Sequence, residues 1–299
     1  MTLPATAPPN PASPPPGAVE LPVVGSLSPS RAADFKTCPL LYRFRAVDKL
    51  PQRPNADALR GTVVHAVLER LFDLPAAERT HAAAVALVSP EWERLREETP
   101  ELAELFAADG EGGGLELAGW LESARELLAS YFALEDPTRI EPAAREELVE
   151  VVLDGGLRLR GYVDRLDVAP TGDIRVIDYK TGGAPREAYE AKALFQMKFY
   201  ALVLWRTRGV VPRQLRLMYL RDREALTYSP DADELRRFER TLHAIWAAID
   251  RARQAKDFRP SPSRLCGWCD HQALCPAYGG TPPPYPEDDT PGLAPSEGH

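Results

Sequence analysis

Two aspartates and a lysine in neighbouring segments have the side chains that metal-assisted phosphodiester hydrolysis requires. Asp178 and Lys180 are two residues apart in VIDYK, and Asp164 precedes them in GYVDRLD. Two carboxylates that face each other repel unless a cation lies between them, and carboxylate oxygens suit Mg²⁺ or Mn²⁺. The lysine could orient or deprotonate a metal-bound water, or stabilise charge at the phosphorane. The same residues could also form an ordinary exposed acid–lysine surface on a half-buried hairpin.

These residues lie in segments that alternate with a period of two, which predicts a β-hairpin. Segments 157–168 and 174–180 each put every second side chain on one face. Residues 170–172 (PTG) predict a three-residue loop whose glycine is left-handed. In that register apolar side chains meet apolar side chains, and Asp164 lies opposite Asp178 with Cβ atoms about 4.5–5.5 Å apart.

Further polar side chains occur in pairs at helical spacing. His65 and Glu69 are four residues apart and share one face of a predicted helix. A neutral His65 imidazole could complete the coordination sphere of a metal, although a lone buried histidine is more often a hydrogen-bonded core residue. Gln196 and Tyr200 are also four residues apart, in the helix predicted after the hairpin. Their spacing alone indicates only a polar notch on an amphipathic helix.

All four cysteines could belong to one metal site. Cys266, Cys269 and Cys275 form C-x2-C-x5-C, and Cys38 lies far upstream. In a cytosolic protein such clustering favours a metal over disulfides, and both zinc and a [4Fe–4S] cluster accept four thiolates. The one-plus-three arrangement favours iron–sulfur, because zinc usually takes two paired knuckles. His271 keeps open a structural Zn²⁺ site with a histidine ligand. Either metal would clamp the end of the folded chain onto its first helix.

The elements that must position these residues indicate an α/β protein. Periodicity and capping predict helices at 28–38, 59–71, 90–135 with an interruption at 110–114, 189–205 and 231–256. They predict strands at 148–153, 157–168, 174–180 and 215–220. The folded part is predicted to span 28–278. A Pro-rich tail at 1–27 and an acidic tail at 279–299 are expected to be disordered.

Length and charge narrow the class of protein. The chain has 299 residues and a net charge of −8, and no apolar run approaches the ~20 residues that cross a bilayer. No secretory signal is visible, so we expect a cytoplasmic globular protein without a membrane partner. The acidity is segregated, since residues 89–150 hold 17 acids and 5 bases. The remaining folded chain is net basic, which suits contact with nucleic acid.

Four segments together resemble the motifs of the RecB-like branch of the PD-(D/E)xK nucleases, in the family order: GTVVHAVLERL (61–71), GYVDRLD (161–167), VIDYKTG (176–182) and FQMKFYALVL (195–204). The four cysteines resemble the ligands of that family's iron–sulfur subgroup, which includes the AddB nuclease domain and the CRISPR-adaptation exonucleases. The resemblance covers roughly 28–278. It implies a restriction-endonuclease-like core, a mixed central sheet flanked by helices. Residues 89–135 would be an acidic helical insert, and 261–278 the cysteine-cluster segment.

The resemblance also implies a role for each matching residue. Lys180 matches the catalytic lysine, and the ligands of a catalytic Mg²⁺ or Mn²⁺ would be His65, Asp164, Asp178 and the backbone carbonyl of Tyr179. Gln196 and Tyr200 match a Q-x3-Y motif that helps to hold substrate DNA. The ligands of a [4Fe–4S] cluster would be Cys38, Cys266, Cys269 and Cys275. The third motif reads D-x-K here and not E-x-K, which the family tolerates.

The activity that the resemblance implies is a metal-dependent DNA exonuclease, acting on single-stranded DNA or DNA ends in repair or recombination. No G-x4-G-K-[ST] motif is present, so any unwinding would come from a helicase partner. The alternative is a catalytically retired nuclease fold that binds DNA or scaffolds a helicase complex. Its site should have lost a residue, whereas His65, Asp164, Asp178 and Lys180 are all present. A third hypothesis is a zinc-clamped interaction module with no role on DNA.

Overall fold

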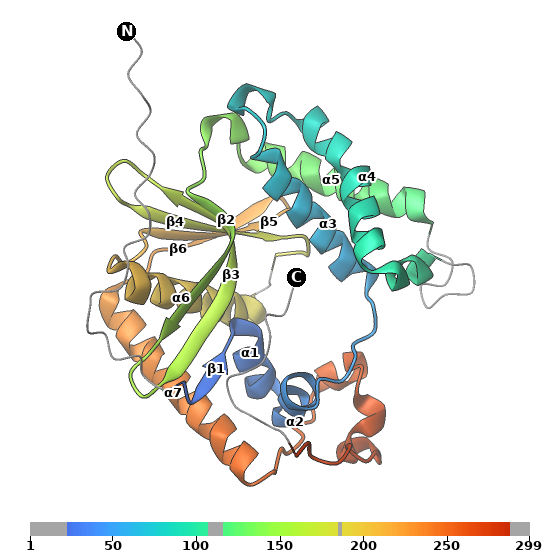
Figure 1. Ribbon diagram of the computed structural model, residues 1–299, viewed down its shortest axis with the longest axis vertical. Helices are drawn as coiled ribbons and strands as arrows, with labels where there is room; N and C mark the ends of the chain where they lie inside the picture. Colours follow the sequence, from blue (N-terminus) through green and yellow to red (C-terminus); the bar gives the residue numbers. More distant parts are fainter. Residues whose placement is uncertain (1–22, 107–115, 185–186, 288–299) are drawn as a thin grey trace.

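The computed structural model describes residues 23–106, 116–184 and 187–287, and a mixed β-sheet runs through this part of the chain (Figure 1). Its six strands are β1 (Gly25–Leu27), β2 (Ala144–Val152), β3 (Leu157–Val168), β4 (Ile174–Lys180), β5 (Gln214–Tyr219) and β6 (Glu224–Tyr228). The hydrogen-bonded order is β1-β3-β4-β5-β6, and β2 also pairs with β3. The β1–β3 and β4–β5 pairs are parallel and the others antiparallel. The expected mixed central sheet is therefore confirmed.

Helices cover both faces of this sheet. They are α1 (Pro29–Thr37), α2 (Pro39–Tyr42), α3 (Ala56–Leu71), α4 (His81–Glu98), α5 (Leu117–Leu134), α6 (Glu187–Arg208) and α7 (Ala232–Gln254). Shorter helical segments are η1 (Arg43–Val47), η2 (Ala76–Glu78), η3 (Pro100–Phe106), η4 (Pro137–Arg139), η5 (Arg264–Trp268), η6 (Gln272–Leu274) and η7 (Pro276–Tyr278). The Ser28 and Asp231 side chains cap α1 and α7, as typical N-cap residues do. In the described ranges, every helix is too short or too polar to cross a membrane.

The β3–β4 hairpin has the predicted register. Val168 pairs with Ile174, and the N–H of Ala169 donates to the carbonyl of Asp173 at 2.9 Å. Gly172 has φ +85°, the left-handed conformation that a three-residue loop requires. Turn geometry and apolar pairing together fixed the register.

β3 pairs with three other strands. Residues 157–159 pair with β1 and residues 165–168 pair with β4 along the same edge, while β2 runs along the opposite edge. Between them, residues 160–164 have no strand partner on the first edge within the described chain. The sheet therefore forks along β3, with β1 on one branch and β4 on the other (Figure 1).

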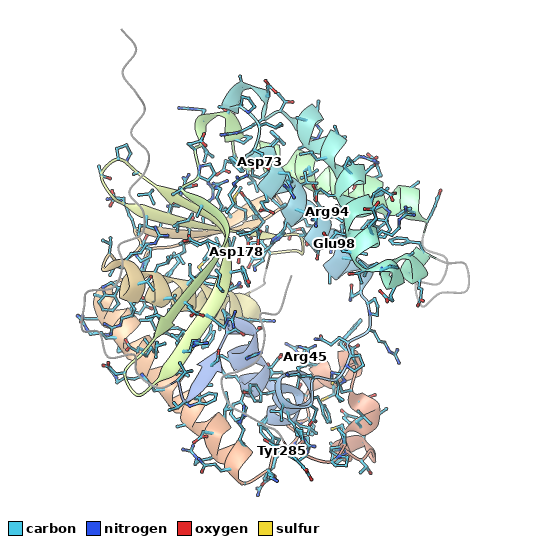
Figure 2. The ribbon with its side chains drawn as sticks, viewed as in Figure 1. Arg45, Asp73, Arg94, Glu98, Asp178 and Tyr285 are labelled. Carbon is cyan, nitrogen blue, oxygen red and sulfur yellow. The ribbon has the colours of Figure 1, made fainter. Side chains whose placement is uncertain are left out.

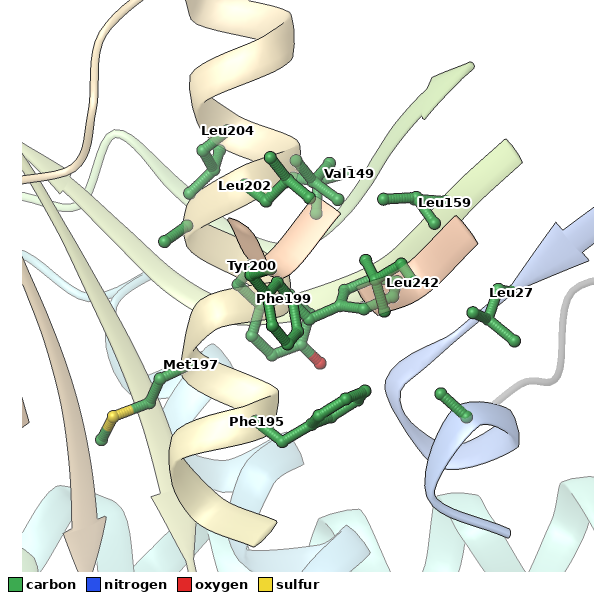
Figure 3. Close-up of a cluster of buried hydrophobic side chains, with 14 of the residues drawn as sticks. Leu27, Val149, Leu159, Phe195, Met197, Phe199, Tyr200, Leu202, Leu204 and Leu242 are labelled. Atoms are coloured by element: carbon green, nitrogen blue, oxygen red, sulfur yellow. The ribbon is translucent and has the colours of Figure 1, made fainter. Parts of the chain in front are cut away.

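Two hydrophobic cores lie on opposite faces of the sheet, because successive strand side chains point to opposite sides. Val176 and Leu217 belong to the core that includes residues of α1, α6 and α7, part of which Figure 3 shows along α6. Ile177 and Met218, the next residue on each strand, belong to the core built with α3, α4 and α5. Each central strand is therefore buried on both faces.

The segment 89–135, which we expected to be an acidic helical insert, contributes to the second core. Trp92, Trp120 and Leu128 are buried there, and the Trp120 indole donates to the carbonyl of Ala56 at 2.9 Å. Most of its described acidic residues lie on the outer faces of helices whose inner faces are apolar, whereas Glu91 and Glu135 are buried. The segment is thus a helical layer over β4 and β5, and its first helix starts earlier, at His81.

Ordered structure extends beyond both ends of the expected folded part at 28–278. Strand β1 lies within 1–27, where we expected a disordered tail, and Leu27 is buried in the core. Within 279–287, Tyr285 stacks on Phe258 with ring centroids 6.1 Å apart. A few apolar residues among the prolines suffice to dock these segments. Residues 1–22 and 288–299, and the interruption at 110–114, lie outside the described ranges.

Candidate metal centre

Ionisable side chains from three elements converge near the C-terminal end of β4, where Figure 2 labels Asp178. His65 lies on α3, Asp164 on β3, and Asp178 and Lys180 on β4. The Nδ1 atom of His65 is 3.6 Å from Oδ2 of Asp164, and Nζ of Lys180 is 2.6 Å from Oδ2 of Asp178. The fold brings together the four residues that the sequence singled out for metal and phosphate chemistry.

The backbone N–H and carbonyl of Tyr179 on β4 contact side chains from β3 and α3. Its backbone N–H donates to Oδ2 of Asp164 at 2.6 Å, and its carbonyl oxygen is 2.9 Å from Nε2 of His65. The β3–β4 ladder ends one step earlier, at the Arg165–Ile177 pair. The Asp164 carboxylate therefore takes a backbone hydrogen bond at the place where we expected it to face Asp178 across the ladder.

Asp178 is held by one side chain on each oxygen. Lys180 contacts Oδ2, and the Gln196 amide donates to Oδ1 at 3.0 Å. Burial raises the pKa of Asp178 to about 6, while the Lys180 ammonium acts in the opposite direction. Lys180 and Asp178 share one strand face, as the period of two predicted. Gln196 comes from α6 on the side that contacts the sheet, so its amide takes part in the centre.

Glu146 is a member of the centre that sequence reasoning missed. Its Oε1 lies 3.9 Å from Nδ1 of His65. The ligand atoms of His65, Glu146 and Asp164 all lie within 4.8 Å of one another. Burial, and next the charge of Asp164, raise the pKa of Glu146 to about 7. Three potential metal ligands thus meet beside the Tyr179 peptide of β4.

The backbone explains both the position of Glu146 and why it was missed. Arg145 pairs with Arg165 and Glu147 with Val163, so Glu146 is the residue across from Asp164. The predicted strand started at residue 148, which left Glu146 outside it. Glu146 has φ +44°, a left-handed conformation that costs a non-glycine residue roughly 1–3 kcal/mol. A period-two pattern extended back to residue 144 would have found it.

Tyr200 lies beneath the centre, one helical turn beyond Gln196 on α6. Its ring packs against Gly161 of β3, where an added Cβ would lie 2.8 Å from Cε1 of Tyr200. Burial, and next the Asp178 carboxylate, raise the pKa of Tyr200 above its usual value, so the hydroxyl stays protonated. The glycine of the GYVDRLD segment is needed here for close packing of α6 on β3.

The centre opens into a groove between α3 and α4. The groove has a volume of about 380 Å³ and is lined by Ala58, Gly61, Thr62, His65, Ala66, Glu69, Arg94, Leu95, Glu98 and Glu146. Small side chains of α3 form one wall. Arg94 and Glu98 of α4, labelled in Figure 2, form the other and are ion-paired to each other at 2.7 Å. The groove carries more carboxylates than cations, so it suits a bound cation better than a bare phosphate.

A second candidate site lies between α1, α2 and the segment after α7. Its cavity of about 60 Å³ is lined by apolar side chains and by all four cysteines, Cys38, Cys266, Cys269 and Cys275. The backbone N–H of Ser261 donates to Sγ of Cys38 at 3.3 Å, and that of Ser263 donates to Sγ of Cys266 at 3.3 Å. The hydrogen bond from the Ser263 backbone lowers the pKa of the Cys266 thiol, which favours the thiolate form that metals bind. His271, the alternative ligand, is buried against the Phe44 ring and is not among the lining residues.

Comparison with known proteins places the chain in a family. The sequence model of the PD-(D/E)XK nuclease superfamily matches residues 26–276. The Gene 69 protein of Mycobacterium phage L5 is 26% identical over 293 residues, covering 84% of this chain and 96% of that protein. The Gene 69 protein of Mycobacterium phage D29 is 27% identical over 275 residues, again covering 84% of this chain and 96% of that protein.

A solved structure shares the fold. The crystal structure of a candidate exonuclease from Eubacterium rectale superposes with a TM-score of 0.54 at 13% sequence identity, covering 83% of this chain and 88% of that chain. Identity this low indicates a common architecture only. The family model spans nearly all of the described chain. The chain belongs to the PD-(D/E)XK nuclease superfamily.

Proposed function

We propose that this protein is a Mg²⁺- or Mn²⁺-dependent DNA exonuclease of the RecB-like branch. The observation that carries the proposal is the convergence of His65, Asp164, Asp178 and Lys180 around the peptide units of Tyr179. A fold that had lost catalysis has no reason to keep a lysine paired with a buried carboxylate beside a His–carboxylate cluster. The retired, DNA-binding alternative is therefore disfavoured.

The donor set fits a divalent cation. In the tautomer that donates from Nε2 to the Tyr179 carbonyl, His65 presents the lone pair of Nδ1 to Asp164 and Glu146. Lone pairs facing carboxylates repel unless a cation lies among them. Metal-binding histidines typically donate their other ring N–H to a backbone carbonyl in this way. The proposed ligands are His65, Glu146, Asp164 and Asp178, with the Tyr179 carbonyl available beside them.

Lys180 and Gln196 prepare the reaction. The chemistry that a bound Mg²⁺ or Mn²⁺ supplies is polarisation of the phosphodiester and a lowered pKa of water. Asp178 holds the Lys180 ammonium 2.6 Å away, where it orients the attacking water and stabilises negative charge on the phosphate oxygens. Gln196 fixes the second oxygen of Asp178, and the protonated Tyr200 hydroxyl supports the same face from α6.

We propose that the substrate is single-stranded DNA or a DNA end, in repair or recombination. The groove at the centre is walled by α3 and α4, which suits one strand better than an intact duplex. The carboxylates that line the groove repel the DNA phosphate. The attraction for the phosphate must therefore come from the bound cation and Lys180. The chain has no nucleotide-driven motor, so duplex substrates would need a helicase partner.

We further propose that the four cysteines hold a [4Fe–4S] cluster in the reducing cytoplasm. They line one apolar cavity, a setting that such clusters occupy. A tetrahedral zinc with Zn–S bonds of about 2.3 Å needs sulfurs about 3.8 Å apart. Among the described residues, no three cysteine sulfurs lie within 4.8 Å of one another. That wider spread favours a larger polynuclear group over a single zinc ion.

Degradation of 5′- or 3′-labelled single- and double-stranded DNA tests the exonuclease proposal. We expect stepwise shortening with Mn²⁺ or Mg²⁺, none in EDTA, and none from Asp164→Asn. Asp173→Asn is the matched control, because Asp173 lies in the loop at the other end of the same hairpin and should cut like the wild type. Unaltered cutting by Asp164→Asn, or DNA that stays intact with either metal, would overturn the proposal.

A further inference from the structure

Arg165, the residue after Asp164 on β3, is fully buried. Its guanidinium forms a bidentate ion pair with Glu135, in which Nη1 donates to Oε1 at 2.6 Å and Nη2 donates to Oε2 at 2.8 Å. It also donates from Nε to Asp167 at 3.0 Å, and Arg175 balances Asp167 from outside at 2.8 Å. Two cations and two anions therefore neutralise one another inside the molecule, as buried charges must.

A further hydrogen bond from this guanidinium reaches the side chain of Tyr179. Nη1 of Arg165 also donates to the hydroxyl of Tyr179 at 2.8 Å, and the guanidinium lies 5.9 Å from the Tyr179 ring centroid. The Tyr179 backbone is the part of the chain that contacts Asp164 and His65. Tyr179 is thus held at both ends, by the metal centre at its backbone and by Arg165 at its ring.

Glu135 connects this arrangement to the helical layer over β4 and β5. It is the C-cap residue of α5, and its side chain is 6% exposed. Burial opposes its ionisation, yet hydrogen bonds from Arg165 hold the pKa of Glu135 below its ordinary value. The end of α5 is therefore tied to β4 by a chain of charge-assisted hydrogen bonds, which are shorter and more directional than neutral ones.

We propose that Glu135, Arg165 and Tyr179 form a positioning relay, through which α5 sets the placement of the Tyr179 backbone and so the geometry of the metal ligands. The inference rests on the proposed metal-dependent function. It gives residues 89–135 a task inside the enzyme beyond covering the sheet. Tyr179 and Arg165 touch no substrate and are positioning residues.

The structure offers a matched pair of variants. Tyr131→Phe and Tyr179→Phe each remove one buried hydroxyl from the same network, since the Tyr131 hydroxyl donates to Oε1 of Glu135 at 3.0 Å. Only Tyr179 carries backbone atoms in the metal centre. A purely structural role predicts that both variants behave alike, whereas the relay predicts that they differ in metal affinity.

The test is Mn²⁺ binding to the full-length chain by calorimetry, with Asp164→Asn defining the site-specific signal. We expect about tenfold weaker Mn²⁺ binding for Tyr179→Phe and for Glu135→Gln, within the 10–100-fold loss usual when support of a metal ligand is removed. Tyr131→Phe should bind Mn²⁺ like the wild type while losing thermal stability similar to that of Tyr179→Phe, measured without metal.

Equal Mn²⁺ affinity in Tyr179→Phe and wild type, or equal weakening by Tyr131→Phe, would overturn the relay and leave the proposed function intact. If Glu135→Gln does not fold, the tyrosine pair still decides. A wild-type chain without Asp164-dependent Mn²⁺ binding would overturn both ideas. A chain that binds Mn²⁺ through Asp164 but leaves DNA intact would overturn only the exonuclease proposal. The Mn²⁺ affinities of the variants would still test the relay.

Discussion

The ammonium of Lys180 lies 2.6 Å from the buried carboxylate of Asp178, two residues earlier on the same strand. The strand's period of two places them side by side, and burial of the Asp178 carboxylate makes it dependent on the lysine. A cation so close to a carboxylate competes with a metal for it. The Lys180 ammonium therefore has two roles. It neutralises Asp178 in the metal-free chain, and it supplies positive charge beside the reacting phosphate.

Lys180→Ala should separate catalysis from metal binding. We expect the rate of DNA cleavage to fall by about 10²–10³-fold, the usual loss when one preorganised charge-stabilising group is removed. Mn²⁺ affinity should be retained or increased, because the competing cation at Asp178 is gone. End-labelled DNA and calorimetry measure the two effects. Cleavage at the wild-type rate would show that Lys180 has no catalytic role.

The stability of the metal-free protein should fall as the pH rises. The pKa values of Asp178 and Glu146 are raised to about 6 and about 7, so the folded chain holds protons that the unfolded chain releases between about pH 4 and 7. The free energy of unfolding therefore decreases across this window. Melting in EDTA measures it, and Glu146→Gln should flatten the decline. A melting temperature that rises from pH 5 to 7 in wild type relative to Glu146→Gln contradicts the prediction.

Mn²⁺ should reverse this trend. Metal ligands must be deprotonated to bind, so stabilisation by Mn²⁺ should grow as the pH rises through about 7. The gain follows from mass action and depends on free Mn²⁺ concentration. Thermal melts with and without Mn²⁺ between about pH 5 and 8 give the difference directly, and Asp164→Asn should lose it. A gain independent of pH would show that other groups bind the metal.

Gly161→Ala should loosen the support of the centre. The new Cβ would lie 2.8 Å from the Tyr200 ring, and such overpacking costs about 1–3 kcal/mol. Gly119→Ala is the matched control, because a Cβ at Gly119 meets no described heavy atom within 4 Å and α5 should gain up to ~1 kcal/mol. Urea unfolding of the two variants should move in opposite directions. Equal shifts would show that Tyr200 can move aside.

Cys269→Ser should remove iron and lower the melting temperature. The cysteines join α1 and α2 to the segment after α7, so loss of a bound cluster removes a link between distant parts of the chain. The adjacent Trp268 is 88% exposed, and Trp268→Ala should change neither property. Iron content, visible absorbance and melting of anaerobically purified protein measure the effect. Colourless, iron-free wild type would contradict the cluster, and stoichiometric zinc in its place would support the alternative metal.

The parts of the fold that local pattern controls were predictable. The β3–β4 register followed from an apolar pairing pattern and one left-handed glycine, Gly172. The cap at Ser28 marked the start of α1. β1 and β6 were not predicted, because GSL is too short for a periodic signal and EALTY is a mostly exposed edge strand with few apolar residues.

The site was predictable as a set of residues but not as an arrangement. His65, Asp164, Asp178 and Lys180 stood out by type and spacing, and the fold brings them together. The hydrogen bond from the Tyr179 backbone to Asp164 depends on where a ladder ends, which no side-chain pattern encodes. Glu146 was hidden because its strand begins among charged residues. Buried charge relations such as Arg165 with Glu135 link segments 30 residues apart and become visible only in three dimensions.

The fork along β3 has a consequence for motion. Asp164 lies at the point where the β1 and β4 branches separate. A change in the angle between the branches would therefore change the geometry of the site. Spreading the fork would pull the Tyr179 backbone from Asp164 without breaking either branch's own ladder. Hydrogen exchange at the Tyr179 amide, which donates to Asp164 at 2.6 Å, would record such spreading.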